Sequence, residues 1–139
     1  MSLWTRFAAR HFYLDANVFI ALLEGDIARQ SRMRDLFALV DSGEILASTS
    51  ALTLAEVLVQ PLARGNAALV RAYETRLANV ASVPVDGAVL RAAAKICGQS
   101  RMDLPDALHV ASALQAGCDV FVTGDSGIVL PGEMERVGV

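Results

Sequence analysis

The sequence has no hydrophobic run long enough to cross a membrane. A spanning helix needs about 20 consecutive apolar residues, and the apolar runs of this chain are interrupted well before that length. Residues 1–10 hold no sustained apolar segment of the kind that secretory signals contain. We therefore expect a cytoplasmic protein without a membrane partner.

Cysteine is scarce, and its two positions form no pattern. Cys97 and Cys118 lack the spacing of zinc ligands, and two cysteines are too few to build a disulfide framework. We interpret both residues as reduced thiols in the core of a cytosolic protein, where cysteine behaves as a small hydrophobic side chain.

Lysine is almost absent, although the chain is rich in arginine. It has eleven arginines and one lysine, Lys95, and its net charge is −3. Without four acids that are candidates for a metal site, the rest of the chain carries a slight positive excess, so the net charge does not exclude a nucleic-acid partner. Arginine binds phosphate through a planar fork, although each arginine could equally lie on a solvated helix face. Two clusters stand out: Arg29, Arg32 and Arg34, and then Arg64, Arg71 and Arg76.

The remaining composition is that of an ordered protein. Hydrophobic residues make up 54% of the chain and charged residues 19%, which excludes an intrinsically disordered protein. A length of 139 residues fits one domain with a hydrophobic core. We therefore predict a single domain that spans residues 1–139.

Short apolar runs alternate with longer amphipathic segments. The runs predict four strands, and the tail predicts a fifth at a sheet edge: 12–14, 45–47, 80–85, 120–123 and 134–139. The longer segments predict six helices: 18–24, 26–42, 51–60, 67–79, 86–98 and 103–117. Pro61 is expected to stop the third helix, because proline has no N–H to donate. The alternation predicts the α/β class, with a central, mostly parallel sheet of four to five strands flanked by helices.

Two of the four candidate acids follow from the first half of the chain. Asp15 comes directly after the first strand, at the sheet edge where open α/β sheets bind ligands. Asn17 could supply a carbonyl oxygen, orient Asp15 or only cap the next helix. Glu56 shares a helical face with Leu52 and Val59, where a lone charge is unfavourable unless it is paired or binds a metal. Alternatively, Glu56 reaches water at the edge of that face or pairs with an arginine.

The other two candidates lie in the last third of the chain. Asp103 is expected to cap the sixth helix, and Asp106 leads into the apolar face of that helix, although an acid in a first helical turn can be purely structural. Asp125 follows the fourth strand, where it could also be an ordinary turn residue. Thr123 and Ser126 could hydrogen-bond a carboxylate or a metal-bound water.

The donor set predicts a hard divalent cation. We expect the carboxylates of Asp15, Glu56, Asp106 and Asp125 to converge, and oxygen ligands of this kind suit Mg²⁺ or Mn²⁺. His109 lies nearby, and we interpret it as a packing residue rather than a ligand. Carboxylates that hold one or two such ions can hydrolyse a phosphodiester by activating water and stabilising the leaving oxygen, and no protein nucleophile is then needed.

Four segments that contain these acids resemble the acidic motifs of the PIN-domain ribonucleases. More narrowly, the whole chain is similar to the VapC-type toxins of bacterial toxin–antitoxin pairs. The segments are LDAN at 14–17, LAEV at 54–57, LPDALHVA at 104–111 and VTGD at 122–125. The chain departs from the family pattern at 126–128, where Ser-Gly-Ile replaces the usual aromatic-bearing end of the last motif.

The resemblance implies a PIN-like three-layer fold and an endoribonuclease that depends on Mg²⁺ or Mn²⁺. It implies that Asp15, Glu56, Asp106 and Asp125 are the metal-site acids, supported by Asn17 or Thr123. It also implies a homodimer, which agrees with a surplus of Ala, Leu and Val in the second to fourth helices. A small antitoxin whose C-terminal segment covers the active groove is the expected inhibitor.

Three other classes remain open at the level of sequence. A receiver domain would also bind Mg²⁺ in an acidic pocket, but it needs a lysine after its last central strand, and Lys95 precedes the fourth strand. A haloacid-dehalogenase-like phosphatase would need two aspartates where this chain has Asp15 and Asn17. The third class is a non-catalytic RNA- or protein-binding domain with a vestigial acidic site. Metal-free protein and Asp15→Asn protein would then behave like wild type.

Overall fold

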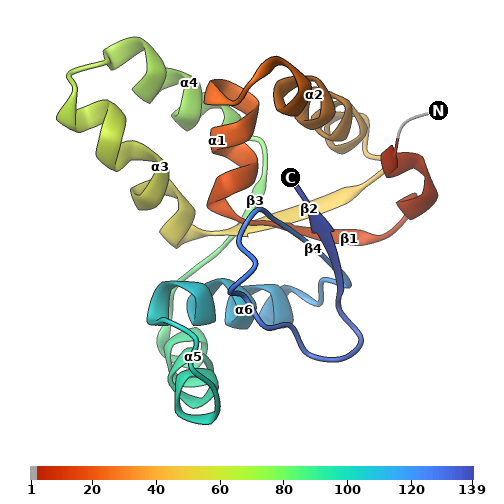
Figure 1. The fold of residues 1–139 in the computed structure, drawn as a ribbon, viewed down its shortest axis with the longest axis vertical. Coiled ribbons are helices and arrows are strands. Elements are labelled where there is room, and N and C mark those ends of the chain that lie inside the picture. The colour runs from red at the N-terminus through yellow and green to blue at the C-terminus, as the bar shows by residue number, and fades with distance from the viewer. Residues whose placement is uncertain (1–2) are drawn as a thin grey trace.

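A five-stranded parallel sheet separates two groups of helices, with α1 to α4 above it and α5 and α6 below it in Figure 1. The computed structural model describes residues 3–139. The strands are β1 (His11–Leu14), β2 (Leu46–Ser50), β3 (Ala81–Val83), β4 (Val120–Thr123) and β5 (Glu135–Gly138), in the spatial order β3-β2-β1-β4-β5. The helices are η1 (Leu3–Phe7), α1 (Ala16–Glu24), α2 (Ile27–Asp41), α3 (Ala51–Ala63), α4 (Ala67–Leu77), α5 (Gly87–Gln99) and α6 (Leu104–Ala116).

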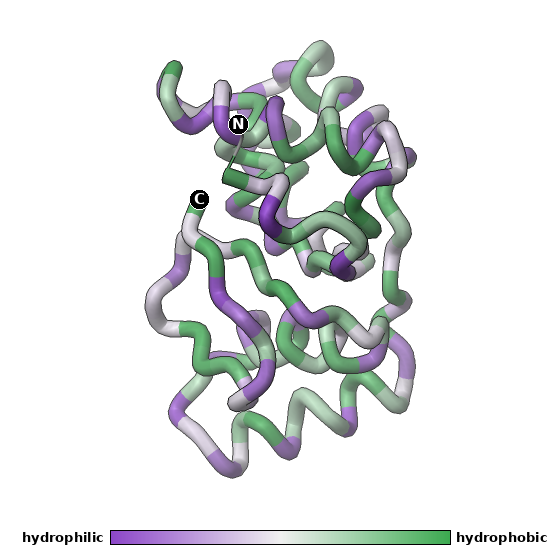
Figure 2. The backbone as a smooth tube through the Cα atoms, turned by 90° about the vertical axis from the view of Figure 1, so that its right-hand side faces the viewer, coloured by the Kyte–Doolittle hydropathy of each residue, from purple (hydrophilic) through white to green (hydrophobic). Residues whose placement is uncertain are grey.

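Alternating side chains of the central strands divide the core in two. Phe12 and Leu14 point into the core shared with α1 and α2, whereas Tyr13 and Phe121 belong to the core shared with α5 and α6. The tube in Figure 2 alternates between hydrophobic and hydrophilic residues along α5, the lowest helix, as expected where one face packs and the other meets water. The three-layer α/β prediction is therefore confirmed.

All four strand pairings are parallel, so the carboxyl ends of the strands lie at one edge of the sheet. The chain moves from β1 outward to β2 and β3, and then returns to the other side of β1 for β4 and β5. Ligands bind at such a reversal of strand order in open α/β sheets. The reversal lies between β1 and β4, which places Asp15 and Asp125 there. None of the helices in residues 3–139 is long and apolar enough to cross a membrane.

The prediction that Pro61 stops the third helix is wrong. Helix α3 continues through Pro61 to Ala63. Proline removes only the hydrogen bond that its own N–H would donate to the carbonyl of Val57, and donors after Pro61 still close the last turn of the helix. The N–H of Arg64 donates to the carbonyl of Gln60 at 3.0 Å, and the N–H of Asn66 donates to the carbonyl of Pro61 at 2.9 Å.

The second strand was predicted too short, because its last three residues are polar. It ends at Ser50 rather than at residue 47, and Ser48, Thr49 and Ser50 are all buried. The Thr49 hydroxyl donates to the carbonyl of Leu14 at 2.6 Å, so a buried polar side chain is satisfied within the sheet. Strand β3 is shorter than predicted and covers only 81–83.

Helix η1 closes one end of the upper core, and no helix was predicted at these residues. Trp4 and Phe7 are buried and meet Phe12 edge-on. Cys97 and Cys118 are free thiols, as expected, and burial raises the pKa of Cys118 to about 12. Burial thus disfavours the thiolate, which is the reactive form of cysteine.

Candidate active site

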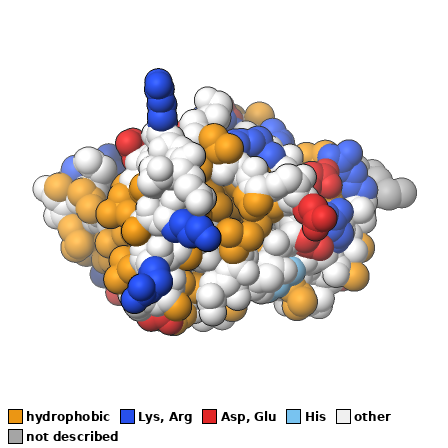
Figure 3. Space-filling view, turned by 90° about the horizontal axis from the view of Figure 1, so that it is seen from below, with side chains coloured by type: hydrophobic (Ala, Val, Ile, Leu, Met, Phe, Trp, Pro, Cys, Tyr) orange, Lys and Arg blue, Asp and Glu red, His pale blue; other side chains and the backbone are white. Residues whose placement is uncertain are grey.

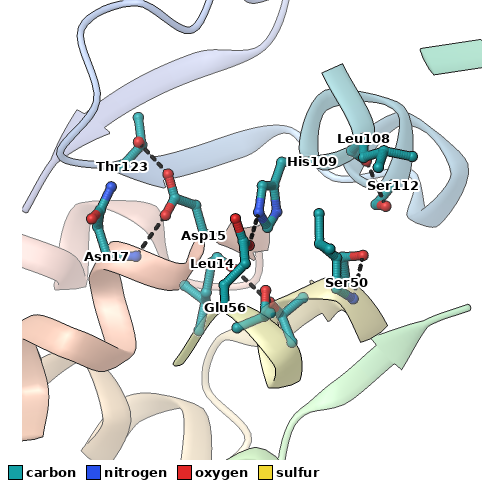
Figure 4. Close-up of polar contacts among 12 residues, drawn as sticks. Leu14, Asp15, Asn17, Ser50, Glu56, Leu108, His109, Ser112 and Thr123 are labelled. Atoms are coloured by element: carbon teal, nitrogen blue, oxygen red, sulfur yellow. Dashed lines mark hydrogen bonds and ion pairs between the residues drawn. The ribbon is translucent and has the colours of Figure 1, made fainter. Parts of the chain in front are cut away.

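Asp15 lies at the centre of the site, immediately after β1. Its carboxylate caps α1 and is only 3% exposed: Oδ1 accepts from the N–H of Asn17 at 2.6 Å, and Oδ2 accepts from the hydroxyl of Thr123. Figure 4 shows these two hydrogen bonds on either side of the carboxylate. Burial raises the pKa of Asp15, and the charge of Glu56 raises it further, whereas the hydrogen bonds from Thr123 and from the backbone N–H of Asn17 oppose the shift.

Thr123 joins two of the candidate acids. Its hydroxyl donates to Asp15 and accepts the backbone N–H of Asp125 at 2.9 Å, so it makes the carboxylate contact expected of it. The side chain of Asp125 accepts from the N–H of Gly127 at 2.8 Å and closes a tight turn. Arg136 of β5 donates to the carbonyl of Asp125 at 2.8 Å and to that of Ile128, so this loop is held in place without the aromatic residue usual in the family.

Asp106 faces Asp125 from the first turn of α6. Burial raises the pKa of Asp106 to about 6, and the charge of Asp125, a hydrogen bond to Asp125 and the charge of Asp15 all act in the same direction. Asp103 occupies the cap position of α6, but its side chain makes no capping hydrogen bond. The structure therefore separates the two acids as expected, with Asp103 exposed and Asp106 turned toward the other carboxylates.

Glu56 pairs with a histidine and not with an arginine. Its Oε1 lies 2.6 Å from Nε2 of His109, and the glutamate side chain is 31% exposed. The charge of Glu56 raises the pKa of both Asp15 and Tyr13, so it faces the same site from α3.

The four acids form a connected series rather than a closed ring. Electrostatic coupling runs from Glu56 to Asp15, from Asp15 to Asp106 and from Asp106 to Asp125. Within residues 3–139, no three His, Cys, Asp or Glu side chains are already close enough together to hold one ion. Mg²⁺ usually keeps several waters and takes only one or two carboxylates, and a cation would relieve the repulsion between these acids. The donor set therefore fits a partly hydrated divalent cation.

A cavity of about 540 Å³ opens beside the acids. Asn17, Thr123 and Asp125 line the side next to the carboxylates, and Arg29 and Arg136 are also in its wall. The site therefore continues into a hollow with both polar and apolar walls, and two arginines are among its lining residues.

The family model of the PIN domain matches residues 12–130. The chain belongs to the PIN domain family. This match includes Asp15, Glu56, Asp106 and Asp125, all of β4 and all of β1 except His11. Comparison with curated protein sequences finds no match.

Solved structures that resemble this PIN domain include three from toxin–antitoxin systems. DNA-bound VapBC from Salmonella typhimurium has a TM-score of 0.71 and 16% identity, and the alignment covers 93% of this chain and 98% of that one. VapC20 from Mycobacterium tuberculosis, titled a Sarcin-Ricin loop cleaving toxin, has a TM-score of 0.64 and 18% identity, with 79% and 86% covered. A toxin–antitoxin complex from Klebsiella pneumoniae has a TM-score of 0.63 and 17% identity, with 87% and 98% covered. At these identities the likeness shows the fold.

The family match removes the receiver and phosphatase alternatives. Lys95, the residue that a receiver domain would need near its acids, is exposed on α5 instead. The PIN domain thus has clustered carboxylates at the strand edge without a nearby lysine on any described element of the site.

Sequence reasoning missed the buried polar pair behind Glu56. Tyr13 and His109 lie 96 positions apart, and Tyr13 Oη is 2.5 Å from Nδ1 of His109. His109 is 2% exposed with both ring nitrogens in hydrogen bonds, so it is a satisfied buried residue, as expected, but one that contacts a site acid. Two signals in the sequence could have indicated this pair: the phenol hydroxyl of Tyr13 within an apolar strand, and the lone His109 on the apolar face of α6.

Thr123→Val is expected to lower the free energy of unfolding by about 2 kcal/mol, because the buried Asp15 loses a hydroxyl donor that valine cannot replace. Thr123→Ser keeps the hydroxyl and is expected to lose less than half as much. Urea denaturation at neutral pH measures both values. Equal losses for the two variants would show that the methyl group, and not the hydroxyl, is what matters at this position.

Proposed function

We propose that this PIN domain is a divalent-metal-dependent endoribonuclease that hydrolyses RNA phosphodiester bonds as the toxin of a toxin–antitoxin pair. The observation that carries the proposal is the convergence of Asp15, Asp106 and Asp125 from three separate elements, with the pKa of Asp106 raised to about 6 by burial and by the neighbouring acids. Such an arrangement is unfavourable for folding alone, so a role with a cation accounts for it.

In the proposed site, Asp106, Asp125 and Asp15 would surround Mg²⁺ or Mn²⁺, with one or two of them as direct ligands and the rest acting through its bound waters, and Glu56 would complete the acidic edge. The cation would supply charge for the phosphate and acidify a water molecule. In hydrolysis, the water oxygen forms a bond to phosphorus and the bond from phosphorus to the leaving oxygen breaks. A site carboxylate accepts the water proton, and the leaving oxygen takes a proton from solvent. Thr123 and the Asn17 backbone hold the Asp15 carboxylate in one orientation throughout.

The cavity beside the acids is the proposed path of the RNA strand. Arg29 lies exposed in its wall, where a guanidinium group can pair with a backbone phosphate. The face at the α5 end, by contrast, mixes basic, acidic and hydrophobic side chains and shows no unbroken basic surface (Figure 3). A strand that follows the cavity would place a phosphate next to Asp125.

Incubation of the purified protein with single-stranded and structured RNA tests the proposal. The protein is expected to cut RNA when Mg²⁺ or Mn²⁺ is present, and Asp15→Asn protein is expected to be inactive. If wild type and Asp15→Asn bound RNA equally and neither cut it, the chain would be a binding domain with a vestigial acidic site.

The proposed protein partner is a small antitoxin that covers the acidic cavity. One structural neighbour is titled a toxin–antitoxin complex, and two others are titled VapBC2 and VapBC bound to DNA, which supports a partner of this kind. A short open reading frame directly upstream of the gene would supply the candidate, and co-purification of its product with a loss of RNA cleavage would identify it.

We also propose a homodimer formed through the outer surface of α3. Val59 and Leu62 are 59% and 61% exposed, lie one turn apart and give this helix an unpaired apolar face. Val59→Asp combined with Leu62→Asp is expected to shift the protein from dimer to monomer at micromolar concentration in sedimentation velocity. Leu114→Asp, at an exposed apolar position on α6, serves as the control and should leave the dimer intact. A monomeric wild type would contradict this assignment.

A further inference from the structure

A chain of three buried or half-buried side chains runs from the sheet to the active-site edge. Tyr13 of β1 contacts Nδ1 of His109 at 2.5 Å, and Nε2 of His109 contacts Oε1 of Glu56 at 2.6 Å. The first two residues are 0% and 2% exposed. In Figure 4 the imidazole of His109 stands beside the Glu56 carboxylate, with Asp15 on the other side of that carboxylate.

The hydrogen-bond partners fix where the protons lie. Burial raises the pKa of Tyr13 far above its usual value, so the phenol keeps its proton. The phenol O–H is buried and needs an acceptor. Nδ1 of His109 is that acceptor, and the single imidazole proton is therefore on Nε2, where it is donated to Glu56.

The opposite orientation does not fit these contacts. If Nδ1 of His109 donated to the Tyr13 oxygen, the buried phenol O–H would be left without an acceptor among the described residues, which is costly. The contacts therefore favour the tautomer with its proton on Nε2.

We propose that Tyr13 and His109 are positioning residues that hold Glu56 for the cation and substrate of the neighbouring site, an inference that rests on the proposed nuclease function. His109 engages Oε1, and no group within residues 3–139 donates to Oε2, which stays available to a hydrated cation. Metal sites commonly depend on such outer hydrogen bonds, because they fix the orientation of a carboxylate that would otherwise sample several rotamers.

The first test reads the histidine directly in metal-free protein. Nitrogen-15 NMR of labelled imidazoles is expected to show the Nε2–H tautomer for His109 at neutral pH, with a proton that exchanges slowly with water. His11, the other histidine of the sequence, lies at the amino end of β1 and serves as the internal reference. An Nδ1–H tautomer would overturn the proposal.

The second test compares variants by Mn²⁺ affinity, kcat and KM. His109→Phe keeps a ring but no donor, and it is expected to weaken Mn²⁺ binding and kcat about 10- to 100-fold. Tyr13→Phe removes only the hydroxyl, so about a 3- to 10-fold loss is expected because the tautomer is no longer fixed. His109→Gln brings an amide N–H toward the position of Nε2 and should recover most of the affinity.

Ser112→Ala is the matched control, because Ser112 is also buried on α6 and its hydroxyl bonds only to the carbonyl of Leu108 at 2.7 Å. It should lower the melting temperature without changing Mn²⁺ affinity. If His109→Phe behaved like Ser112→Ala, the role of His109 would be structural and the proposal would be overturned while the nuclease function stood. If wild type neither bound Mn²⁺ nor cleaved RNA, both proposals would fall together.

Discussion

Asp106→Asn is expected to reduce RNA cleavage by about 10²- to 10³-fold, the scale on which a single charge-stabilising group acts. In metal-free protein at about pH 7.5, the same variant is expected to melt at a higher temperature than wild type. Burial and the charges of Asp125 and Asp15 raise the pKa of Asp106 to about 6 from 3.8. Above that pH the ionised carboxylate destabilises the folded state, and asparagine removes the charge.

The sign of the pH dependence follows from the same shift. The folded protein binds the Asp106 proton more tightly than the unfolded chain does, so wild type loses stability as the pH rises from about 4 to about 6. Asp106→Asn should lack this pH-dependent loss of stability. The melting temperatures of the two proteins should converge below about pH 4, where residue 106 is neutral in both. Thermal melts of both proteins in EDTA, from about pH 4 to about pH 7.5, measure this difference in melting temperature.

Asp103→Asn is the control for this experiment. Asp103 lies one turn away on the same helix, is exposed and makes no side-chain capping bond, and asparagine serves equally well at a cap position. Both cleavage and melting temperature should stay at wild-type values. Full cleavage by Asp106→Asn would remove this carboxylate from the site.

Chelation is expected to have the other large effect. EDTA should reduce RNA cleavage below detection, and excess Mg²⁺ or Mn²⁺ should restore it, because the carboxylates alone repel both one another and the phosphate. A cation at about 100 times its dissociation constant should also raise the melting temperature by roughly 5–10 °C, since it binds only the folded protein.

Asp106→Asn protein is the control for the thermal measurement and should show a much smaller shift with Mn²⁺. Cleavage that persists in EDTA would contradict the role of the acids as metal ligands. A thermal shift of equal size in wild type and variant would place the cation elsewhere on the molecule.

Local signals were most reliable where an element buries one face. The apolar runs located four strands and the tail located the fifth, and aspartate or serine at helix starts marked most of the caps. They failed at the buried Ser48, Thr49 and Ser50 of β2, which look like a loop in sequence but are satisfied by contacts inside the sheet. They also failed at Pro61, because the last turn of a helix can tolerate a residue that its middle cannot.

The family resemblance selected the four acids, and the strand pattern explains two of their positions. Once the strands are parallel, residues that follow β1 and β4 must meet at one edge, which brings Asp15 and Asp125 together. The sequence could not specify that Thr123 would bond both of them, since this depends on the register of β1 against β4.

The sequence by itself determined the fold class, the order of the elements and the acidic character of the strand edge, because periodicity and turn residues act locally. Only the tertiary structure decided that Glu56 faces His109 and that His109 rests on Tyr13, contacts that span 53 and 96 positions. Periodicity tells which face of a helix is buried, but the packing of one layer against another decides which side chain that face meets.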